Sequence, residues 1–278
     1  MIVAAGVFGS LIGSFLNVVV YRVPAGLSVV SPPSACPRCD QRIRGWDNIP
    51  LVSWLVLRGR CRGCSGPISA RYPLVELGTA LGFAAVAAWW LLAAPFGATE
   101  PVTTASAAHL VGALLGLVAF LYLSAISIAL ALIDLDVQRL PDRIVLPAYA
   151  VLAVLLTASA LLAGQPGRLV PAAVGGAALF ALYFLLGVIR PGGMGAGDVK
   201  LAGVLGIALG WLGWPQLIVG AFAAFLVGGV IGITLVAARR VRRGGGIPFG
   251  PWMLAGAWIG IVAGGPIAAG YLNIVGLG

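Results

Sequence analysis

Long, uninterrupted apolar segments dominate this chain and limit what it can fold into. Of its 278 residues, 60% are hydrophobic and only 9% are charged. A helix on the surface of a water-soluble core needs a polar face, and most of these segments have none. A run of about 20 apolar residues can cross a bilayer as a helix, whereas a transmembrane barrel shows shorter, alternating segments. The sequence therefore predicts an all-α polytopic membrane protein.

The apolar runs predict about eight transmembrane helices. The expected spans are 1–21, 72–96, 107–133, 144–164, 169–189, 199–212, 214–238 and 248–275. No basic residue precedes the first run and Arg22 follows it, so we interpret this run as an uncleaved span and not as a signal peptide. The sixth run is short, and we expect it to be tilted or to continue into the seventh through a tight turn.

The 17 basic residues set the expected orientation of these spans. In this topology only Arg168 falls on one side, and all the others lie in loops or at helix ends on the other side. Basic loops stay in the cytoplasm, so the sequence predicts a bacterial cytoplasmic membrane protein with both termini outside. The net charge of +9 then marks topology and contact with the lipid bilayer, as in the basic cluster 239–243, and indicates no nucleic-acid partner.

All four cysteines fall in the first basic loop, 22–71, as two C-x-x-C pairs, Cys36 with Cys39 and Cys61 with Cys64. Four thiolates on two turns suit tetrahedral zinc, and they leave no open position for water, so the metal would be structural. Adjacent arginines are expected to lower the pKa of the thiols. Two disulfides are the alternative, but a cytoplasmic loop disfavours them. Redox chemistry at the C-x-x-C pairs is a second alternative. The sequence lacks the alternation of strands and helices that is expected of a thioredoxin-like redox protein.

Half of the eight acidic residues lie in two short stretches at the ends of apolar runs. Carboxylates at a membrane edge are costly and are functional candidates. Asp134 and Asp136 are two residues apart, so on a helix they point about 200° apart and cannot pair with each other. Asp198 follows a glycine-rich turn at the same membrane depth. Since two carboxyls that share a proton can activate water, we predict that an aspartate of this first stretch forms a catalytic pair with Asp198.

Four motifs in order make the chain resemble a known family, the prepilin peptidases, which belong to the G-x-G-D membrane aspartyl proteases. They are Gly13-Ser14-Phe15-Leu16-Asn17 with Tyr21-Arg22; the cysteine loop with Asp47-Asn48-Ile49-Pro50 and Arg71-Tyr72-Pro73-Leu74-Val75-Glu76; Asp134-Leu135-Asp136 through Leu140-Pro141-Asp142; and Gly193-Met194-Gly195-Ala196-Gly197-Asp198-Val199-Lys200. The resemblance covers nearly the whole chain.

This resemblance implies an activity, its partners and its cofactors. The family consists of bacterial membrane endopeptidases that remove a short basic leader from type IV prepilins and pseudopilins, on the cytoplasmic side and after a glycine. They often then methylate the new N-terminus with S-adenosylmethionine. The family pattern assigns the catalytic pair to Asp134 and Asp198. The resemblance also implies three domains: a first transmembrane helix at 1–21, a four-cysteine zinc-binding loop at 22–71 and a helical protease domain at 72–278.

Several other residues are expected to support the site. Asp136 is interpreted as a supporting or substrate-binding carboxylate, and Asp142 as such a group or as a helix cap. Lys200 is expected to pair with a carboxylate or a phospholipid. Glu76 is expected either to receive the basic leader or S-adenosylmethionine, or to be a helix N-terminal acid. Two glycines of the turn, Gly195 and Gly197, allow close approach of the backbone.

Two other functional classes remain open. One is a G-x-G-D protease that cuts inside the membrane; the cysteine loop and the motif at 13–17 argue against it. The other is a proton-coupled carrier or a scaffold, since intramembrane acids also serve carriers, although no inverted repeat is evident. A dinucleotide-binding loop is excluded at 193–198, because these glycines follow an apolar helix and not a strand.

Overall fold

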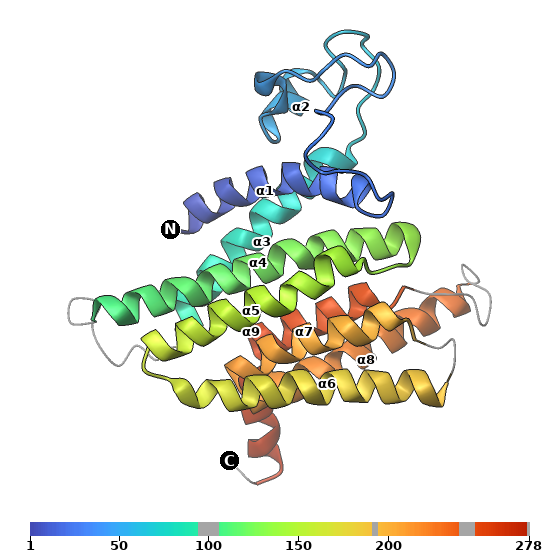
Figure 1. Ribbon diagram of the computed structural model, residues 1–278. Coiled ribbons are helices and arrows are strands. Elements are labelled where there is room, and N and C mark those ends of the chain that lie inside the picture. The colour runs from blue at the N-terminus through green and yellow to red at the C-terminus, as the bar shows by residue number, and fades with distance from the viewer. Residues whose placement is uncertain (94–105, 191–193, 239–247, 277–278) are drawn as a thin grey trace. The chain divides into compact units, whose positions relative to one another are not determined.

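The computed structural model describes residues 1–93, 106–190, 194–238 and 248–276 (Figure 1). Within these ranges the regular structure is helical, and the only extended pairing consists of two isolated β-bridges. The glycine at 193, the last residues of the predicted span 72–96 and the basic cluster 239–243 lie outside the described residues.

Each of the eight predicted spans forms a helix within the described ranges. They are α1 (Ile2–Arg22), α3 (Arg71–Ala93), α4 (Ala107–Val137), α5 (Asp142–Leu162), α6 (Leu169–Ile189), α7 (Ala196–Leu212), α8 (Trp214–Ala237) and α9 (Gly250–Ile274). A short helix, α2 (Val52–Val56), lies in the cysteine loop. Seven of the eight long helices are long and apolar enough to cross a membrane; α7, with 17 residues, is not among them. The predicted all-α membrane fold is confirmed.

The chain divides into two compact units. The first contains residues 1–93 together with 120–129 of α4, and the second contains 94–119 and 130–278. In the first unit α1 packs against α3, and small residues allow the close contact: a Cβ on Gly9 would lie 2.7 Å from the carbonyl oxygen of Thr79. The rings of Trp89 and Trp90 pack against Phe120. This unit also holds the cysteine loop.

In the second unit α7 is the central helix, in contact with α5, α6, α8 and α9 (Figure 1). It is buried along most of its length, and Trp211 at its end donates a hydrogen bond to the carbonyl of Leu156 on α5 (3.1 Å). Glycines bring the helix backbones together: a Cβ on Gly206 would lie only 2.7 Å from the carbonyl carbon of Gly175 on α6. Small residues at such crossings are typical of membrane helix packing. Because protein surrounds α7, it need not match the lipid thickness.

Candidate functional site

Asp134 lies in the last turn of α4 and is 4% exposed. The helix ends just beyond it, because Gln138 adopts a left-handed conformation (φ 51°) and donates its main-chain N–H to the carbonyl of Asp134 at 2.9 Å. Oδ2 of Asp134 accepts a hydrogen bond from the main-chain N–H of Gly250, the first residue of α9, at 3.0 Å. One carboxylate oxygen of Asp134 is therefore fixed by a residue 116 positions away.

Asp198 lies in the first turn of α7, and its carboxylate closes that turn. Oδ2 of Asp198 accepts the main-chain N–H of Gly195 at 3.0 Å, while the main-chain N–H of Asp198 donates to the carbonyl of Gly195 at 3.0 Å. This reciprocal arrangement is the acidic half of a capping box, and the positive end of the helix dipole favours a negative charge there.

The structure places both aspartates at helix ends in the second unit. Asp134 and Asp198 lie within range of each other's charge. Leu140, in the connection after α4, packs against the start of α7 and the start of α9. A Cβ on Gly197 of α7 would lie 2.8 Å from Cβ of Leu140, and a Cβ on Gly250 of α9 would lie 3.3 Å from Cδ2 of Leu140. The end of α4 and the starts of α7 and α9 thus meet around one leucine.

The other predicted residues of this region have different surroundings. Asp136 is exposed. Asp142 lies in the first turn of α5, whose N-cap residue is Pro141, and both of its oxygens accept from Nζ of Lys200 at 2.8 Å. Asp142 therefore joins α5 to α7, and Lys200 has a carboxylate partner as expected. Tyr149 adds a second link, since its hydroxyl donates to the carbonyl of Lys200 at 2.6 Å.

Glu76 lies in the first unit, with 8% of its surface exposed. It is the sixth residue of α3, beyond the first turn, so the alternative of a helix N-terminal acid is wrong. Its Oε2 accepts the main-chain N–H of Leu51 at 2.7 Å. Leu51 precedes α2 with φ 62°, so Glu76 fixes a left-handed turn of the cysteine loop against α3.

The four cysteines lie on two turns of the same design. In the first turn Asp40 donates its main-chain N–H to the carbonyl of Cys36, and in the second Ser65 donates to the carbonyl of Cys61, both at 2.9 Å. Asp40 and Ser65 both have positive φ, 52° and 54°. A β-bridge closes each turn, Ala35 with Arg42 and Arg60 with Pro67.

The sulfur geometry suits a tetrahedral metal ion. The Sγ atoms of Cys36, Cys39, Cys61 and Cys64 all lie within 4.8 Å of one another, and no disulfide joins them. Sγ of Cys36 lies 3.8 Å from Sγ of Cys64. With metal–sulfur bonds of about 2.3 Å, the edge of a regular tetrahedron of sulfurs is about 3.8 Å. The four cysteines are therefore positioned to bind a metal ion.

Local interactions shift the pKa values of Cys36 and Cys39 in opposite directions. Main-chain N–H groups of Arg38 and Cys39 lower the pKa of Cys36 to about 6. The N–H of Gln41 acts to lower the pKa of Cys39, but burial and the neighbouring thiols outweigh it and raise this pKa to about 12. Main-chain N–H groups, and not the arginine side chains expected from the sequence, favour the thiolate of Cys36. A bound cation would stabilise all four thiolates together.

A salt bridge joins Asp47, which lies between the two cysteine pairs, to Arg62, which lies within the second pair. Arg62 donates to Asp47 through Nη2 at 2.7 Å and through Nε at 3.0 Å. The hydrogen bond from Arg62, assisted by the charges of Arg62 and Arg44, lowers the pKa of Asp47 even though burial acts against it.

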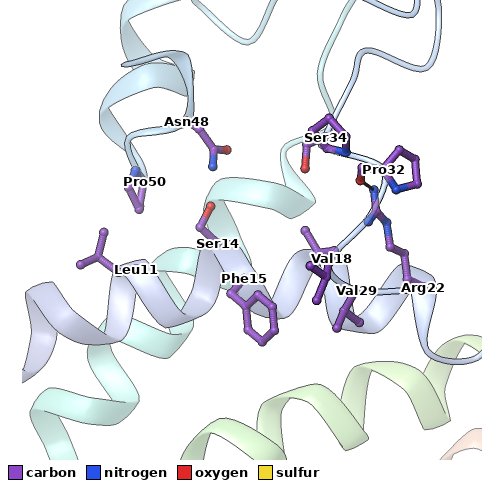
Figure 2. Close-up of a pocket in the computed structure, with 12 residues that line it drawn as sticks. Leu11, Ser14, Phe15, Val18, Arg22, Val29, Pro32, Ser34, Asn48 and Pro50 are labelled. Atoms are coloured by element: carbon purple, nitrogen blue, oxygen red, sulfur yellow. Dashed lines mark hydrogen bonds between the residues drawn. The ribbon is translucent and has the colours of Figure 1, made fainter. Parts of the chain in front are cut away.

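A pocket of about 330 Å³ lies between α1 and the cysteine loop in the first unit. Figure 2 shows Ser14 of α1 and Asn48 of the loop lying on either side of it, with Leu11 close to Pro50. Arg22 forms one end: its guanidinium donates to the carbonyls of Ser28 (3.0 Å) and Pro32 (2.7 Å) and so holds the loop against the helix. Two residues of the motif at 13–17, Ser14 and Phe15, therefore line a cavity whose wall is both polar and apolar.

Sequence reasoning predicted a helix over 248–275 but missed the contact of its start with Asp134. Gly250 contacts Asp134, and the ring of the preceding Phe249 packs against Tyr183 of α6 and Phe225 of α8, with ring centroids 6.2 and 5.8 Å apart. Tyr183 also lies within range of the charge of Asp198. The only local signal was the run Pro248-Phe249-Gly250-Pro251, which is typical of a helix start and says nothing about a partner on α4.

Comparison with known proteins gives a consistent family. Residues 7–90 match the bacterial peptidase A24 N-terminal domain, and residues 121–233 match the type IV leader peptidase family. The chain is 35% identical over 300 residues to the prepilin leader peptidase/N-methyltransferase of Stutzerimonas stutzeri, covering 99% of this chain and 95% of that protein. It is 37% identical over 292 residues to the proteins of the same name in Pseudomonas aeruginosa PAO1 and Aeromonas hydrophila, covering 96% of this chain and 92% of each. No solved structure matches it. The chain belongs to the type IV leader peptidase family.

Proposed function

We propose that this protein is an aspartic endopeptidase of the bacterial inner membrane that removes the basic leader peptide from type IV prepilins and pseudopilins after a glycine. The observation that carries the proposal is the junction in the second unit where Leu140 contacts Gly197 and Gly250, beside Asp198 and Asp134, each of which has one oxygen fixed by a main-chain N–H. The membership of the chain in the type IV leader peptidase family supports the choice of substrate.

In this proposal the pair works as an aspartyl dyad. One carboxylate takes a proton from water, the water oxygen bonds to the scissile carbonyl carbon, and the other, protonated carboxyl donates to the carbonyl oxygen. The C–N bond then breaks, and the leaving amine takes up a proton. Because Oδ2 of each aspartate accepts a main-chain N–H, we assign the water and the substrate carbonyl to the Oδ1 atoms.

The placement of basic residues supports the proposed orientation. With both termini outside, the end of α4 and the starts of α5 and α7 face the cytoplasm, where Arg139 follows α4, Arg143 lies at the start of α5 and Lys200 lies near the start of α7. The substrate would enter with its apolar helix in the lipid and its basic leader at the cytoplasmic face. Asp136 is exposed and is our candidate for contact with that leader, whereas Asp142 and Lys200 hold α5 and α7 together.

We propose a structural zinc ion in the loop 22–71, between a first transmembrane helix (1–21) and the protease domain (72–278). The sulfur spacing of Cys36, Cys39, Cys61 and Cys64 supports zinc. The loop is also held by polar contacts such as that of Asp47 with Arg62, and a metal would compensate for its small core.

We further propose that the pocket between α1 and the cysteine loop binds S-adenosylmethionine. The name N-methyltransferase carried by the relatives motivates this assignment, and the pocket volume of about 330 Å³ falls in the range of small-molecule sites. Ser14 and Asn48 would supply polar contacts, with Val18 and Pro50 against the apolar parts. When bound, the sulfonium supplies a methyl group to the new N-terminal amine, which loses a proton.

Cleavage of a model prepilin by the purified chain in detergent tests the endopeptidase. We expect a cut after the leader glycine by the wild type, and a loss of at least about 1,000-fold in Asp134→Asn and in Asp198→Asn, since each removes one member of the dyad. Asp40→Asn is a matched control: asparagine tolerates the left-handed conformation at this position, and the cleavage rate should remain that of the wild type. A folded wild type that cuts no prepilin would contradict the proposal.

The methyl donor site needs its own test. Binding of labelled S-adenosylmethionine should be weakened at least tenfold by Val18→Trp, which fills the pocket, and should be unchanged by Val3→Trp on an exposed part of α1. Equal affinity of the two variants would place the methyl donor elsewhere.

A further inference from the structure

The start of α9 offers Asp134 a hydrogen-bond donor that has no role within its own helix. The first four N–H groups of an α-helix have no intrahelical acceptor. Gly250 is the first residue of α9, and its N–H donates to Oδ2 of Asp134 at 3.0 Å in a buried environment. The positive end of the helix dipole lies at the same place, which favours a negative oxygen there.

Residue 250 has no room for a side chain. A Cβ at this position would lie 2.8 Å from Oδ2 of Asp134 and 3.3 Å from Cδ2 of Leu140. The φ of this residue is not in the left-handed region, so the space and not the backbone conformation requires glycine. Any side chain would move the Asp134 carboxylate. Movement on the other side is restricted, because Leu140 is already held against Gly197 at the start of α7.

The donor is itself held in place. The preceding residue, Phe249, inserts its ring among aromatic rings of two other helices, Tyr183 and Phe225. A Cβ on Gly228 of α8 would lie 2.7 Å from the Phe249 ring, so α8 closes tightly over it. Such packing leaves little freedom to the N–H of residue 250.

We propose that Gly250 is a positioning residue for cleavage: its main-chain N–H fixes the carboxylate of Asp134 in the orientation that the dyad needs, and its lack of a side chain makes this contact possible. The inference rests on the proposed function of Asp134 and goes beyond it by adding α9 to the catalytic apparatus. A misplacement of a catalytic group by about 1 Å can cost about 100-fold in rate.

The first test compares Gly250→Ala with Gly229→Ala in the full-length protein. A Cβ on Gly229 of α8 meets no atom within 4 Å, so this control has the same chemical change without the clash. On a model prepilin, we expect Gly250→Ala to lower kcat about 100-fold with KM within about threefold of wild type, because substrate contacts are unchanged. Gly229→Ala should keep the kcat and Tm of the wild type.

A second variant separates positioning from folding. Glycolic acid in place of Gly250, introduced by nonsense suppression, replaces the N–H by an ester oxygen and adds no atom. Helix α9 keeps its internal N–H donors, so the protein should remain folded, with a Tm lowered by only the few degrees that the lost hydrogen bond to Asp134 costs, while kcat falls at least tenfold. A wild-type kcat in the ester variant would overturn the proposal, even where Gly250→Ala does not fold. If the wild type itself cuts no prepilin, the proposed function fails instead, so the two failures are distinguishable.

Discussion

Oε2 of Glu76 lies 2.7 Å from the main-chain nitrogen of Leu51 and accepts its hydrogen bond. The carboxylate is buried on α3, and the N–H belongs to Leu51, which has a positive φ and precedes the short helix α2. This side chain therefore attaches the cysteine loop to α3 within the first unit. The loop is expected to depend on its metal, and this contact is a second, independent attachment.

Removing this carboxylate should loosen the loop. We expect Glu76→Ala to lower the free energy of unfolding by about 1–3 kcal/mol, because a buried N–H loses a charged acceptor. Glu76→Gln keeps an acceptor oxygen and should lose less. Denaturation of the detergent-solubilised protein, followed by reactivity of the loop thiols, measures both variants. Equal thiol protection in wild type and Glu76→Ala would contradict this role.

The salt bridge between Asp142 and Lys200 should contribute little to stability. Both side chains are partly exposed, 53% and 34%, so solvent screens the pair. We expect Asp142→Asn and Lys200→Met each to change the free energy of unfolding by at most about 1 kcal/mol and to leave cleavage within about threefold of wild type. A double-mutant cycle on Tm and cleavage rate measures the coupling. A loss of activity comparable to that of Asp198→Asn would show that Lys200 does more than link α5 to α7.

The metal site predicts a fixed stoichiometry. Purified protein should hold one zinc ion per chain. Cys36→Ser or Cys64→Ser should each lower the zinc content severalfold, because each variant leaves only three of the four sulfur ligands. Elemental analysis measures the zinc, and the absorption of a cobalt-substituted sample reports tetrahedral sulfur ligation. Ser34→Ala, in the same segment, is the control and should keep its zinc. Two disulfides in freshly purified protein would refute the site.

The ion pair of Asp47 with Arg62 predicts a pH dependence of loop stability. The folded pKa of Asp47 is lowered by the hydrogen bond from Arg62, so it lies below the unfolded value of about 3.9. The stabilisation is thus present above the unfolded pKa and is lost as the pH falls through the folded pKa. The stability difference between wild type and Asp47→Asn should be constant from pH 7 to about 5 and should shrink below about 4. A pH-independent difference would be inconsistent with this pair.

The contact of Gly197 with Leu140 predicts a further glycine effect. A Cβ on residue 197 would lie 2.8 Å from Cβ of Leu140, so Gly197→Ala should shift the start of α7 and with it Asp198. We expect kcat for leader cleavage to fall at least tenfold. Gly78→Ala, where a Cβ meets nothing within 4 Å, should cut at the wild-type rate. Retained activity in Gly197→Ala would mean that the α7 turn adapts without moving the carboxylate.

The eight apolar runs predicted the long helices of the described chain closely, because a membrane helix satisfies its own backbone and so depends mainly on local composition. The first cysteine turn illustrates the same point, since Cys36 and Cys39 are three residues apart and one turn is enough to bring them together. The catalytic pairing of Asp134 with Asp198 stays a prediction: helix geometry excludes a pair between Asp134 and Asp136, and the family pattern selects Asp134 as the partner of Asp198.

The sequence by itself determined the helices, the cysteine turns and the identity of the candidate acids, because these follow from composition, spacing and local hydrogen bonds. Only the tertiary structure decided what each acid contacts: Asp134 meets Gly250, Glu76 meets Leu51, and Asp142 meets Lys200. These pairs join segments distant in sequence, and two of the donors are main-chain N–H groups that every residue type except proline carries. No side-chain pattern can mark such a donor, so its partner is set by how the helices pack.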